Sequence, residues 1–297
     1  MSLHPLYARP RNLEQAIELL SGLNAGAVII AGGQELMPTI NSGVMMPDVL
    51  VDIGGIEALR GISSDAGEIA IGALTVHRDV QDSELLQEQL PLLAYAAGLV
   101  GGGWQVHNRG TIGGNIVSMH PLYDIAPSLL ALEADVELIN EQGLQRQSFA
   151  ALLSDTNHGL GSNAILTRVL IQPTADDQRC GYYKLKNSTG AYGSANAAAV
   201  LRVENDTIKG IRVVIGAAGE QLTLVSEALD FCLGSNTRSD WISEYGVRVE
   251  QACAGVVGIP LSDHQGDGRW RRAMAGVVAC RAIEKALGAQ HNLDINH

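Results

Sequence analysis

The amino-acid sequence predicts an α+β protein of two domains, and three observations indicate this fold class. A helix, a strand, a loop and a second strand follow one another in about the first 55 residues, as in a small α/β layer. The segment 173–179 is polar and rich in chain-breaking residues, which indicates a domain boundary. Beyond it strands precede helices, which is typical of an antiparallel sheet covered on one face. We therefore expect a domain over 1–175, with subdomains at about 1–55 and 56–175, and a smaller domain over 176–297.

The first subdomain is predicted from one helix and two short strands. Apolar residues recur at helical spacing over 12–22, where Asn12 is a plausible N-cap and Gln15 stands three residues on, in the capping-box position. The run 27–30 is β-branched and short, which favours a buried strand. It leads directly into a Gly-Gly turn, and a second strand is expected over 49–53.

The second subdomain begins with a predicted hairpin over 59–62 and 68–72. Residues 75–100 have a largely helical pattern, in which Pro91 would open a second helix. A helix over 124–131 and strands over 134–139 and 165–171 are expected to complete this domain. In the C-terminal domain we expect strands over 181–185, 195–203 and 208–215, and then helices over 223–233, 240–254 and 269–287.

Composition and charge exclude several classes of function. The formal net charge is −12, which argues against nucleic acid or an anionic membrane surface as the main partner. No stretch approaches the length of an apolar membrane span, and we expect no signal peptide at the N-terminus. The four cysteines are far apart and form no CxxC pair, so we expect neither a zinc site nor an iron–sulfur cluster in this chain. Reduced thiols in a cytoplasmic protein are the expected state.

Glycines are concentrated in the stretch 101–115, which reads as a loop. Such a density indicates either tight turns or a backbone that closes on a ligand. Within it, Thr111–Asn115 offers a hydroxyl, a run of backbone amides and a carboxamide, and Arg109 is a nearby cation. These groups are of the kind that bind a phosphate or pyrophosphate, although a plain glycine-rich turn is the alternative.

A second glycine element, Ala31–Leu36, directly follows the strand predicted over 27–30. It is not a Rossmann fingerprint, because no GxGxxG leads into a helix, and it is not a Walker A loop, because no Gly-Lys-Ser/Thr follows. Alone it would most often be a turn. Together with Thr111–Asn115 it favours a ligand site, and we expect the two elements to act together.

Three further residues could serve either structure or ligand binding. Asp124 stands where a helix N-cap is expected, and acids in this kind of place also bind ribose hydroxyls. Lys184 falls on an alternating strand pattern typical of a solvated face. Tyr192 lies among small residues, where an aromatic ring either fills a gap or stacks on a flat ligand. The histidines at 107 and 120 lack metal-ligand spacing and read as polar loop residues.

Taken together, Ala31–Leu36, Asn108–Asn115 and Asp124 resemble the FAD-binding (medium) subunit of the molybdenum hydroxylases, the xanthine dehydrogenase and carbon monoxide dehydrogenase family. The resemblance covers nearly the whole chain. It implies a vanillyl-alcohol-oxidase-type (PCMH-like) FAD-binding domain of two α/β subdomains. A smaller C-terminal α+β domain with an antiparallel sheet and helices would follow.

The resemblance also implies cofactor-binding residues. Glu35 departs from the family pattern, which commonly has Ser, Thr or Asp there, so its side chain is expected to point away from a pyrophosphate. Residues 187–191 lack the arginines and aspartate that the family often carries. The pyrophosphate would be held by Ala31, Gly32, Gly33, Gln34, Glu35, Leu36, Thr111, Ile112, Gly113, Gly114 and Asn115, and the rest of FAD would meet Gly101, Asp124, Leu166, Lys184 and Tyr192, the last covering one face of the flavin.

The function implied by the resemblance is electron transfer. Non-covalent FAD would pass electrons from two [2Fe-2S] clusters of a small partner subunit to an external acceptor. A large molybdopterin-binding subunit would carry the substrate chemistry, and the assembly would be a heterotrimer or its dimer. No catalytic acid–base pair and no metal ligands are expected in this chain. The alternatives are a freestanding flavoprotein oxidoreductase that acts directly on a small substrate, and a non-catalytic scaffold without FAD.

Overall fold

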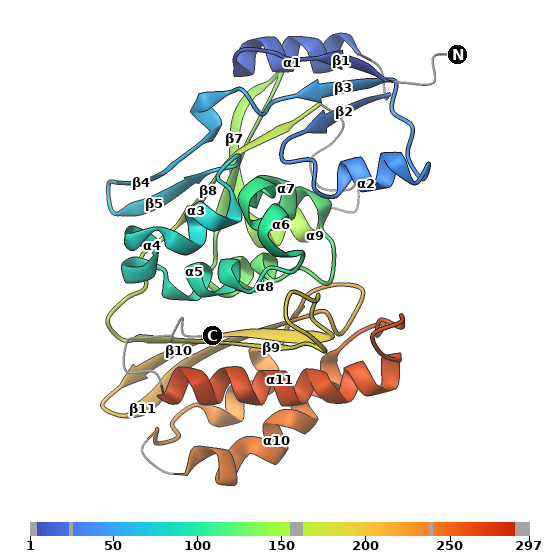
Figure 1. Ribbon diagram of the computed structural model, residues 1–297. Helices are drawn as coiled ribbons and strands as arrows, with labels where there is room; N and C mark the ends of the chain where they lie inside the picture. Colours follow the sequence, from blue (N-terminus) through green and yellow to red (C-terminus); the bar gives the residue numbers. More distant parts are fainter. Residues whose placement is uncertain (1–4, 24–25, 155–162, 238–239, 289–297) are drawn as a thin grey trace. The chain divides into compact units, whose positions relative to one another are not determined.

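The computed structural model describes residues 5–23, 26–154, 163–237 and 240–288 (Figure 1). By their internal contacts the residues divide into two units that interleave along the chain, so the single boundary near residue 175 stays a prediction. The first unit comprises 1–79, 104–118 and 133–172, and the second comprises 80–103, 119–132 and 173–297. The helices α3 (His77–Asp82) and α6 (Gly103–Arg109) carry the chain from one unit to the other.

The first unit opens with a three-stranded parallel sheet in the order β1-β3-β2. Its strands are β1 (Leu6–Ala8), β2 (Ala27–Ile30) and β3 (Val49–Asp52). Helix α1 (Leu13–Gly22) packs Ala16 and Leu20 into one core with Val51. This confirms the predicted α/β layer. Strand β1 and helix α2 (Leu36–Asn41) were not predicted, because each is too short to show a pattern.

The start of α1 follows the predicted capping, with one difference. The Asn12 side chain accepts a hydrogen bond of 2.9 Å from the Gln15 backbone N–H, as an N-cap does. The Gln15 side chain accepts in return from Arg11, one residue before the cap, rather than from Asn12 itself. The helix ends at Gly22, and Leu23 is its C-cap.

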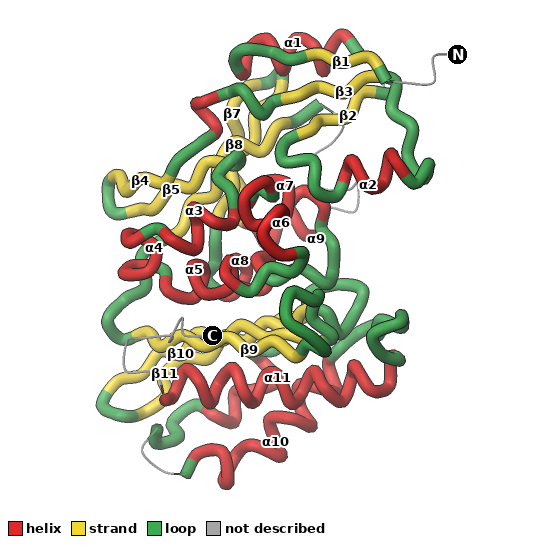
Figure 2. The backbone as a smooth tube through the Cα atoms, in the orientation of Figure 1, coloured by secondary structure: helices red, strands yellow, loops and turns green. Residues whose placement is uncertain are grey.

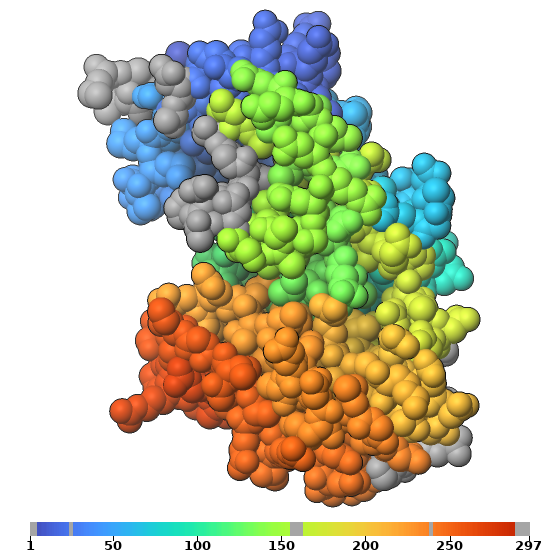
Figure 3. Space-filling model, turned by 180° about the vertical axis from the view of Figure 1, so that it is seen from behind, coloured from blue at the N-terminus to red at the C-terminus, as the bar shows by residue number. Residues whose placement is uncertain are grey.

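The first unit also contains a five-stranded antiparallel sheet in the order β4-β5-β8-β6-β7. The predicted hairpin and the strand predicted over 165–171 are both part of it. Strand β7 was not predicted, because it is polar and lies at the sheet edge, where its yellow-green atoms form part of the surface in Figure 3. The strands are β4 (Ile62–Asp65), β5 (Glu68–Gly72), β6 (Asp135–Asn140), β7 (Gly143–Ser148) and β8 (Ile165–Ile171), and α9 (Phe149–Ser154) follows β7.

The second unit is built on a four-stranded antiparallel sheet in the order β12-β11-β10-β9. Its strands are β9 (Gln178–Leu185), β10 (Ala195–Glu204), β11 (Thr207–Gly216) and β12 (Thr223–Leu224). Helices α10 (Trp241–Val256) and α11 (Gly268–Gly288) cover one face, as predicted. The other face is covered as well, by α5 (Pro91–Gly98) and α8 (Ile125–Ala131) (Figure 1). Accordingly β10 is almost entirely buried and shows no alternation of polar and apolar residues.

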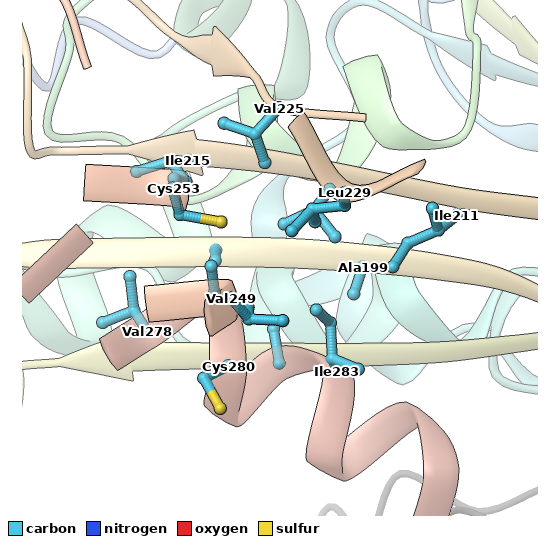
Figure 4. Close-up of a cluster of buried hydrophobic side chains, with 14 of the residues drawn as sticks. Ala199, Ile211, Ile215, Val225, Leu229, Val249, Cys253, Val278, Cys280 and Ile283 are labelled. Carbon is cyan, nitrogen blue, oxygen red and sulfur yellow. The ribbon is translucent and has the colours of Figure 1, made fainter. Parts of the chain in front are cut away.

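The core of the second unit lies between the sheet and its two C-terminal helices. Figure 4 shows Ala199 and Ile211 from the sheet beside Val249 of α10 and Ile283 of α11. Cys253 and Cys280 also belong to this core, and all four cysteines are buried free thiols. Burial raises the pKa of Cys253 to about 12, so this thiol stays protonated and packs as a small apolar side chain.

Two predictions about local structure were wrong. The glycine-rich stretch 101–115 is not a loop, because it contains α6 and most of α7 (Ile112–Ser118), drawn as red helices in Figure 2. The helix expected over 223–233 is instead the short strand β12 followed by a 3₁₀ helix, Glu227–Cys232. In the second of these segments tertiary contacts outweigh the helical pattern, because β12 pairs with β11 and the 3₁₀ helix contributes Leu229 and Cys232 to the core. Two further short elements, the 3₁₀ helix Glu57–Leu59 and α4 (Glu84–Gln89), complete the fold.

Candidate functional site

The two glycine elements meet in the first unit, as expected. Gly32 lies directly against the backbone that joins α6 to α7. A β-carbon on Gly32 would lie 1.9 Å from the carbonyl oxygen of Arg109, far inside any allowed contact. Gly33 has a φ of +69°, a conformation that side-chain-bearing residues rarely adopt. Glycine is therefore required at both positions, at Gly32 by close approach and at Gly33 by backbone conformation.

The loop between β2 and α2 leaves several backbone donors available. Within it the Met37 amide donates to the Gly33 carbonyl at 3.1 Å, and the Gln34 side chain donates to the Gly32 carbonyl at 3.4 Å. No described residue accepts a hydrogen bond from the backbone amides of Gly32, Gly33 or Gln34. Ala31, just before them, packs against the core of the first unit. A fixed loop that presents consecutive amides is suited to an anionic oxygen.

The remaining two loop residues differ in exposure. Leu36 is partly buried and begins α2. Glu35 is exposed, and its carbonyl accepts hydrogen bonds from the Thr39 hydroxyl at 2.8 Å and the Thr39 amide at 3.2 Å. That the Glu35 side chain points away from an anionic ligand stays a prediction.

The backbone amides at the start of α7 were expected to donate to a ligand, but in the structure they donate to partners within the chain. The Ile112 amide donates to Thr75 and the Gly113 amide to Ala73, each at 2.9 Å. The remaining two amides, at 114 and 115, donate to the hydroxyl and carbonyl of Thr111 at 3.1 and 3.0 Å. The four amides proposed as ligand donors thus all have partners inside the chain. Thr111 acts as the cap of α7.

What α7 does offer to a ligand is the side chain of Asn115. This residue is 7% exposed, and its Oδ1 has no hydrogen-bond partner among the described residues. Buried carboxamides are normally paired, so this oxygen is available to accept a hydrogen bond from a water molecule or from a donor group of a ligand. Gly113 has a different role, because a β-carbon there would lie 2.7 Å from the β-carbon of Ala73. Packing alone requires glycine at this position.

A buried histidine supports the α6–α7 junction from behind. His77 is 2% exposed, and its backbone amide donates to the Gly110 carbonyl at 3.1 Å. A β-carbon on Gly110 would lie 3.0 Å from the His77 ring. Burial, assisted by the nearby His107, lowers the pKa of His77 to about 4. The ring is therefore neutral at physiological pH and serves as packing beneath the junction.

In the second unit, Asp124 and Lys184 form a buried ion pair. The Lys184 Nζ lies 2.7 Å from Asp124 Oδ2, with the two side chains 2% and 1% exposed. Lys184 also donates to the carbonyl of Leu99, at the end of α5, at 2.8 Å. The other carboxylate oxygen, Oδ1, accepts from the Tyr182 hydroxyl at 3.1 Å and from Asn196 at 3.4 Å. The network thus joins α5, α8, β9 and β10.

This network changes how Asp124 and Lys184 are interpreted. Asp124 is at the N-cap position of α8, but its side chain makes no capping hydrogen bond. Burial raises the pKa of Asp124, and the positive charge of Lys184 opposes that rise. Lys184 is not on a solvated face, because β9 is covered by helices on both sides. Both residues hold elements of the second unit together, and direct contact with a cofactor stays a prediction for each.

Tyr192 belongs to a stack of three rings that the sequence did not reveal. Its ring lies 6.1 Å from that of His120 and 5.9 Å from that of Tyr123, with interplanar angles of 25° and 23°. His120 and Tyr123 lie 4.8 Å apart. His120 was interpreted as a polar loop residue, because it lies 72 positions before Tyr192 in the sequence and no local pattern connects the two. Tyr192 is 38% exposed, so the stack presents an aromatic surface to solvent.

Gly101 packs against the same loop as Tyr192. A β-carbon on Gly101 would lie 3.1 Å from the carbonyl oxygen of Gly190 and 3.2 Å from the amide of Tyr192. The neighbouring Gly102 amide donates to the Gly190 carbonyl at 2.9 Å. The structure therefore brings Gly101 close to the backbone of Tyr192, and the contact of both residues with FAD stays a prediction.

The predicted residues are divided between the two units. The residues 31–36 and 111–115 lie in the first unit, together with Leu166, which is 4% exposed in β8 and pairs with Leu138. The residues 101, 124, 184 and 192 lie in the second unit. Among the residues that the structure describes, no cluster of histidine, cysteine, aspartate or glutamate could hold a metal ion. None of the described helices is long and apolar enough to cross a membrane.

Comparison with known families places both parts of the chain. Residues 2–174 match the family described as the FAD binding domain in molybdopterin dehydrogenase. Residues 181–286 match the family described as the CO dehydrogenase flavoprotein C-terminal domain. The two matches follow one another along the chain and cover most of it.

Individual relatives agree with this placement along the full length. The carbon monoxide dehydrogenase medium chain of Hydrogenophaga pseudoflava is 32% identical over 283 residues, which cover 94% of this chain and 96% of the relative. The nicotine 6-hydroxylase medium subunit of Paenarthrobacter nicotinovorans is 28% identical, with 94% and 96% covered. A solved structure of the Hydrogenophaga carbon monoxide dehydrogenase superposes with a TM-score of 0.89 at 30% identity, covering 96% of this chain and 98% of the other. Quinoline 2-oxidoreductase from Pseudomonas putida superposes at 0.87 and 26% identity, with 97% and 98% covered.

Proposed function

The chain belongs to the FAD-binding medium subunits of the molybdenum hydroxylases, and on this basis we propose that it binds FAD non-covalently and conducts electrons from a partner subunit to an external acceptor. The observation that carries the proposal is the meeting of Gly32 with the backbone of Arg109, in a region matched by the family's FAD-binding domain. When bound, FAD supplies the redox chemistry, and the protein supplies position and electrostatics.

The first unit fits the pyrophosphate part of FAD. The amides of Gly32, Gly33 and Gln34 would donate to phosphate oxygens, since no described residue accepts from them. Asn115 would meet a donor group of the cofactor, such as a hydroxyl or an N–H, rather than a phosphate oxygen, because its unpaired atom, Oδ1, is an acceptor. Ile112, Gly113 and Gly114 would act indirectly, because their amides fix the start of α7 and so place Asn115.

The second unit fits the flavin. Tyr192, held beside His120 and Tyr123, would cover one face of the ring system. Gly101 has no side chain, so the loop that carries Tyr192 would be able to pack closely against it. Asp124 and Lys184 would give this region its rigidity, since each is committed to the other and to backbone or hydroxyl partners. For Leu166, an apolar contact with FAD is proposed on the family resemblance alone.

These assignments support electron transfer over direct substrate chemistry. A flavoprotein that oxidises its own substrate needs an acid or base with a suitable pKa beside the flavin. Asp124 and Lys184 are the charged residues among those assigned to the flavin, and their buried pairing makes them unsuited to exchange protons with a substrate. The freestanding oxidoreductase is thus the less favoured alternative.

The partners follow from the relatives. The matched chains of Hydrogenophaga pseudoflava and Paenarthrobacter nicotinovorans are called a medium chain and a medium subunit, and one related structure is described as a Cu,Mo-CO dehydrogenase. We therefore propose a large molybdopterin-binding partner and a small partner with two [2Fe-2S] clusters, in a heterotrimer or its dimer. We place this assembly in the cytoplasm, where the four buried thiols would stay reduced.

Affinity purification from the source cells tests the partnership. The tagged chain is expected to bring down two stoichiometric partners, with molybdenum and iron present in the eluate and the flavin reduced only when the whole complex receives substrate. If the chain is instead recovered alone and its flavin is reduced directly by a small substrate, the freestanding alternative is correct and the proposed partnership is wrong.

A further inference from the structure

Arg271, in the first turn of α11, is a fully buried arginine in the second unit. Its side chain is 0% exposed, and burying a guanidinium is costly unless its donors are paired. One terminal nitrogen, Nη1, donates to the carbonyl oxygens of Ser194, at 3.1 Å, and Ala217. The other, Nη2, donates to Asp263 at 2.6 Å. The third nitrogen, Nε, has no hydrogen-bond partner among the described residues, so the two terminal nitrogens make all of this side chain's hydrogen bonds to them.

The Ser194 carbonyl stands at the base of the loop that carries Tyr192. This loop leaves β9 after Leu185 and returns to β10 at Ala195. The Ser194 amide donates back to the Leu185 carbonyl at 2.8 Å and closes the loop. Arg271 binds the other side of the same residue, so it fixes the point from which Tyr192 projects two positions earlier.

Ala217 connects Arg271 to the segment that carries the other two rings of the stack, His120 and Tyr123. Ala217 has a φ of +59°, which is costly for an alanine and is sustained by its surroundings. Its amide donates to the carbonyl of Pro121 at 2.9 Å. Pro121 directly follows His120 and comes two residues before Tyr123. Arg271 therefore binds the residue that anchors the second segment of the stack.

We propose that Arg271 is a positioning residue that sets the aromatic stack of His120, Tyr123 and Tyr192 by tying together the two backbone segments that carry these rings. The carbonyls of Ser194 and Ala217 share one guanidinium nitrogen, so they are held at a fixed separation. Asp263 orients the guanidinium from the opposite nitrogen. The consequence for FAD rests on the proposed function: the fixed rings would form a ready-made surface for the flavin.

The first test needs no FAD and uses trypsin on the full chain. Lys186 is exposed and stands at the start of the loop, so the rate of cleavage after it reports on loop opening. Arg271→Met keeps the volume but removes the donors, and Arg271→Lys keeps the charge but cannot reproduce the planar donor geometry. We expect cleavage on the order of tenfold faster in both, as loss of hydrogen bonds to a charged group implies.

The matched control is Val249→Ala, a cavity-forming change in α10 within the same hydrophobic core. It reproduces a loss of stability without touching the hydrogen bonds of Arg271. If the Arg271 variants are cleaved no faster than Val249→Ala at the same distance below the melting temperature, Arg271 is only a core residue and the proposal is overturned. Arg271→Lys also keeps the test usable should Arg271→Met not fold.

The second test uses FAD-loaded chain and flavin fluorescence, which a ring lying against the flavin quenches. We expect Arg271→Lys to raise the residual flavin fluorescence several-fold over wild type. In a Tyr192→Leu background the same substitution should cause no further increase in fluorescence, because both changes act on the same stack. Equal increases in both backgrounds would overturn the proposal. Should the wild-type chain bind no FAD, the proposed function fails, while the trypsin comparison still decides the role of Arg271.

Discussion

Gly32 is the residue on which the cofactor assignment depends most. The carbonyl of Arg109 occupies the space where a side chain at position 32 would begin. Such close approach of two backbones leaves the amides of Gly32 and Gly33 on the surface of a fixed loop. The site is thus formed by contact between two segments about 77 residues apart, and a single methyl group is enough to separate them.

We predict that Gly32→Ala removes FAD and costs about 1–3 kcal/mol of stability, as overpacking against backbone does. The control is Gly22→Ala, at the end of α1 in the same unit, where a β-carbon would meet nothing within 4 Å. That variant should retain wild-type flavin content. Flavin absorbance per chain and urea unfolding measure both effects. Equal flavin content in the two variants would show that the contact at Gly32 does not shape the site.

His77 makes the stability of the first unit depend on pH. Its pKa is about 4 in the folded chain, against 6.5 for an unperturbed histidine, so the unfolded chain takes up a proton that the folded chain rejects. Stability from this group is complete above pH 6.5 and falls as the pH decreases toward 4. We predict a loss of about 2 kcal/mol between pH 7.5 and 5 by proton linkage. In His77→Gln this part of the pH dependence should disappear; an unchanged profile would mean that other groups cause it.

At the scale of elements, the Asp124–Lys184 pair explains how the helices α5 and α8 are attached to β9. Lys184 leaves β9 and reaches the carbonyl at the end of α5 as well as the carboxylate at the start of α8. Tyr182, two residues earlier on the same strand, contacts the same aspartate. One strand face therefore fixes the ends of two helices.

We predict that Lys184→Met costs about 3–5 kcal/mol, because it leaves a buried carboxylate without its cation. The double variant Asp124→Asn with Lys184→Met should cost less than Lys184→Met alone, since no uncompensated charge remains. Urea unfolding of the four members of this cycle gives the coupling energy. Costs that simply add would show that the pair does not act as a unit.

Local patterns predicted much of the fold, and long-range contacts account for what they missed. The Asn12 cap and the strand Ile165–Ile171 are visible in the sequence because cap chemistry and β-branched runs are local signals. The glycines near 113 indicate a loop by propensity, yet packing against Ala73 makes α7 a helix. Similarly, Lys184 on an alternating strand reads as exposed, because nothing local reveals that helices cover both faces.

The sequence predicted residues of the candidate site only where they belong to a local motif. The glycine elements at 31–36 and 108–115 stand out as sequence, and the structure brings Gly32 against the backbone of Arg109, while their joint binding of a ligand stays a prediction. The backbone amides of residues 112–115 were expected to be free to donate to a ligand, but each donates to a partner within the chain. His120, Tyr123 and Arg271 were missed, because a stack of rings and a buried arginine both depend on residues distant in the chain.

For the molecule as a whole, the predicted cofactor contacts are not confined to one matched family. The family described as an FAD binding domain matches residues 2–174, and the predicted contacts at 184 and 192 lie beyond it, in the C-terminal part. A cofactor that binds only the folded chain stabilises it by mass action, so added FAD should raise the melting temperature. The melting temperature of the intact chain, measured with and without FAD, therefore reports on cofactor binding by the folded chain.

The flavin content of the purified chain tests the central claim most directly. The account predicts a yellow protein with stoichiometric FAD, which is released into solution when the chain is denatured by acid or heat. The released cofactor is identified by its absorbance and mass. A correctly folded chain that is colourless, and that takes up no FAD on incubation with the free cofactor, would contradict the account.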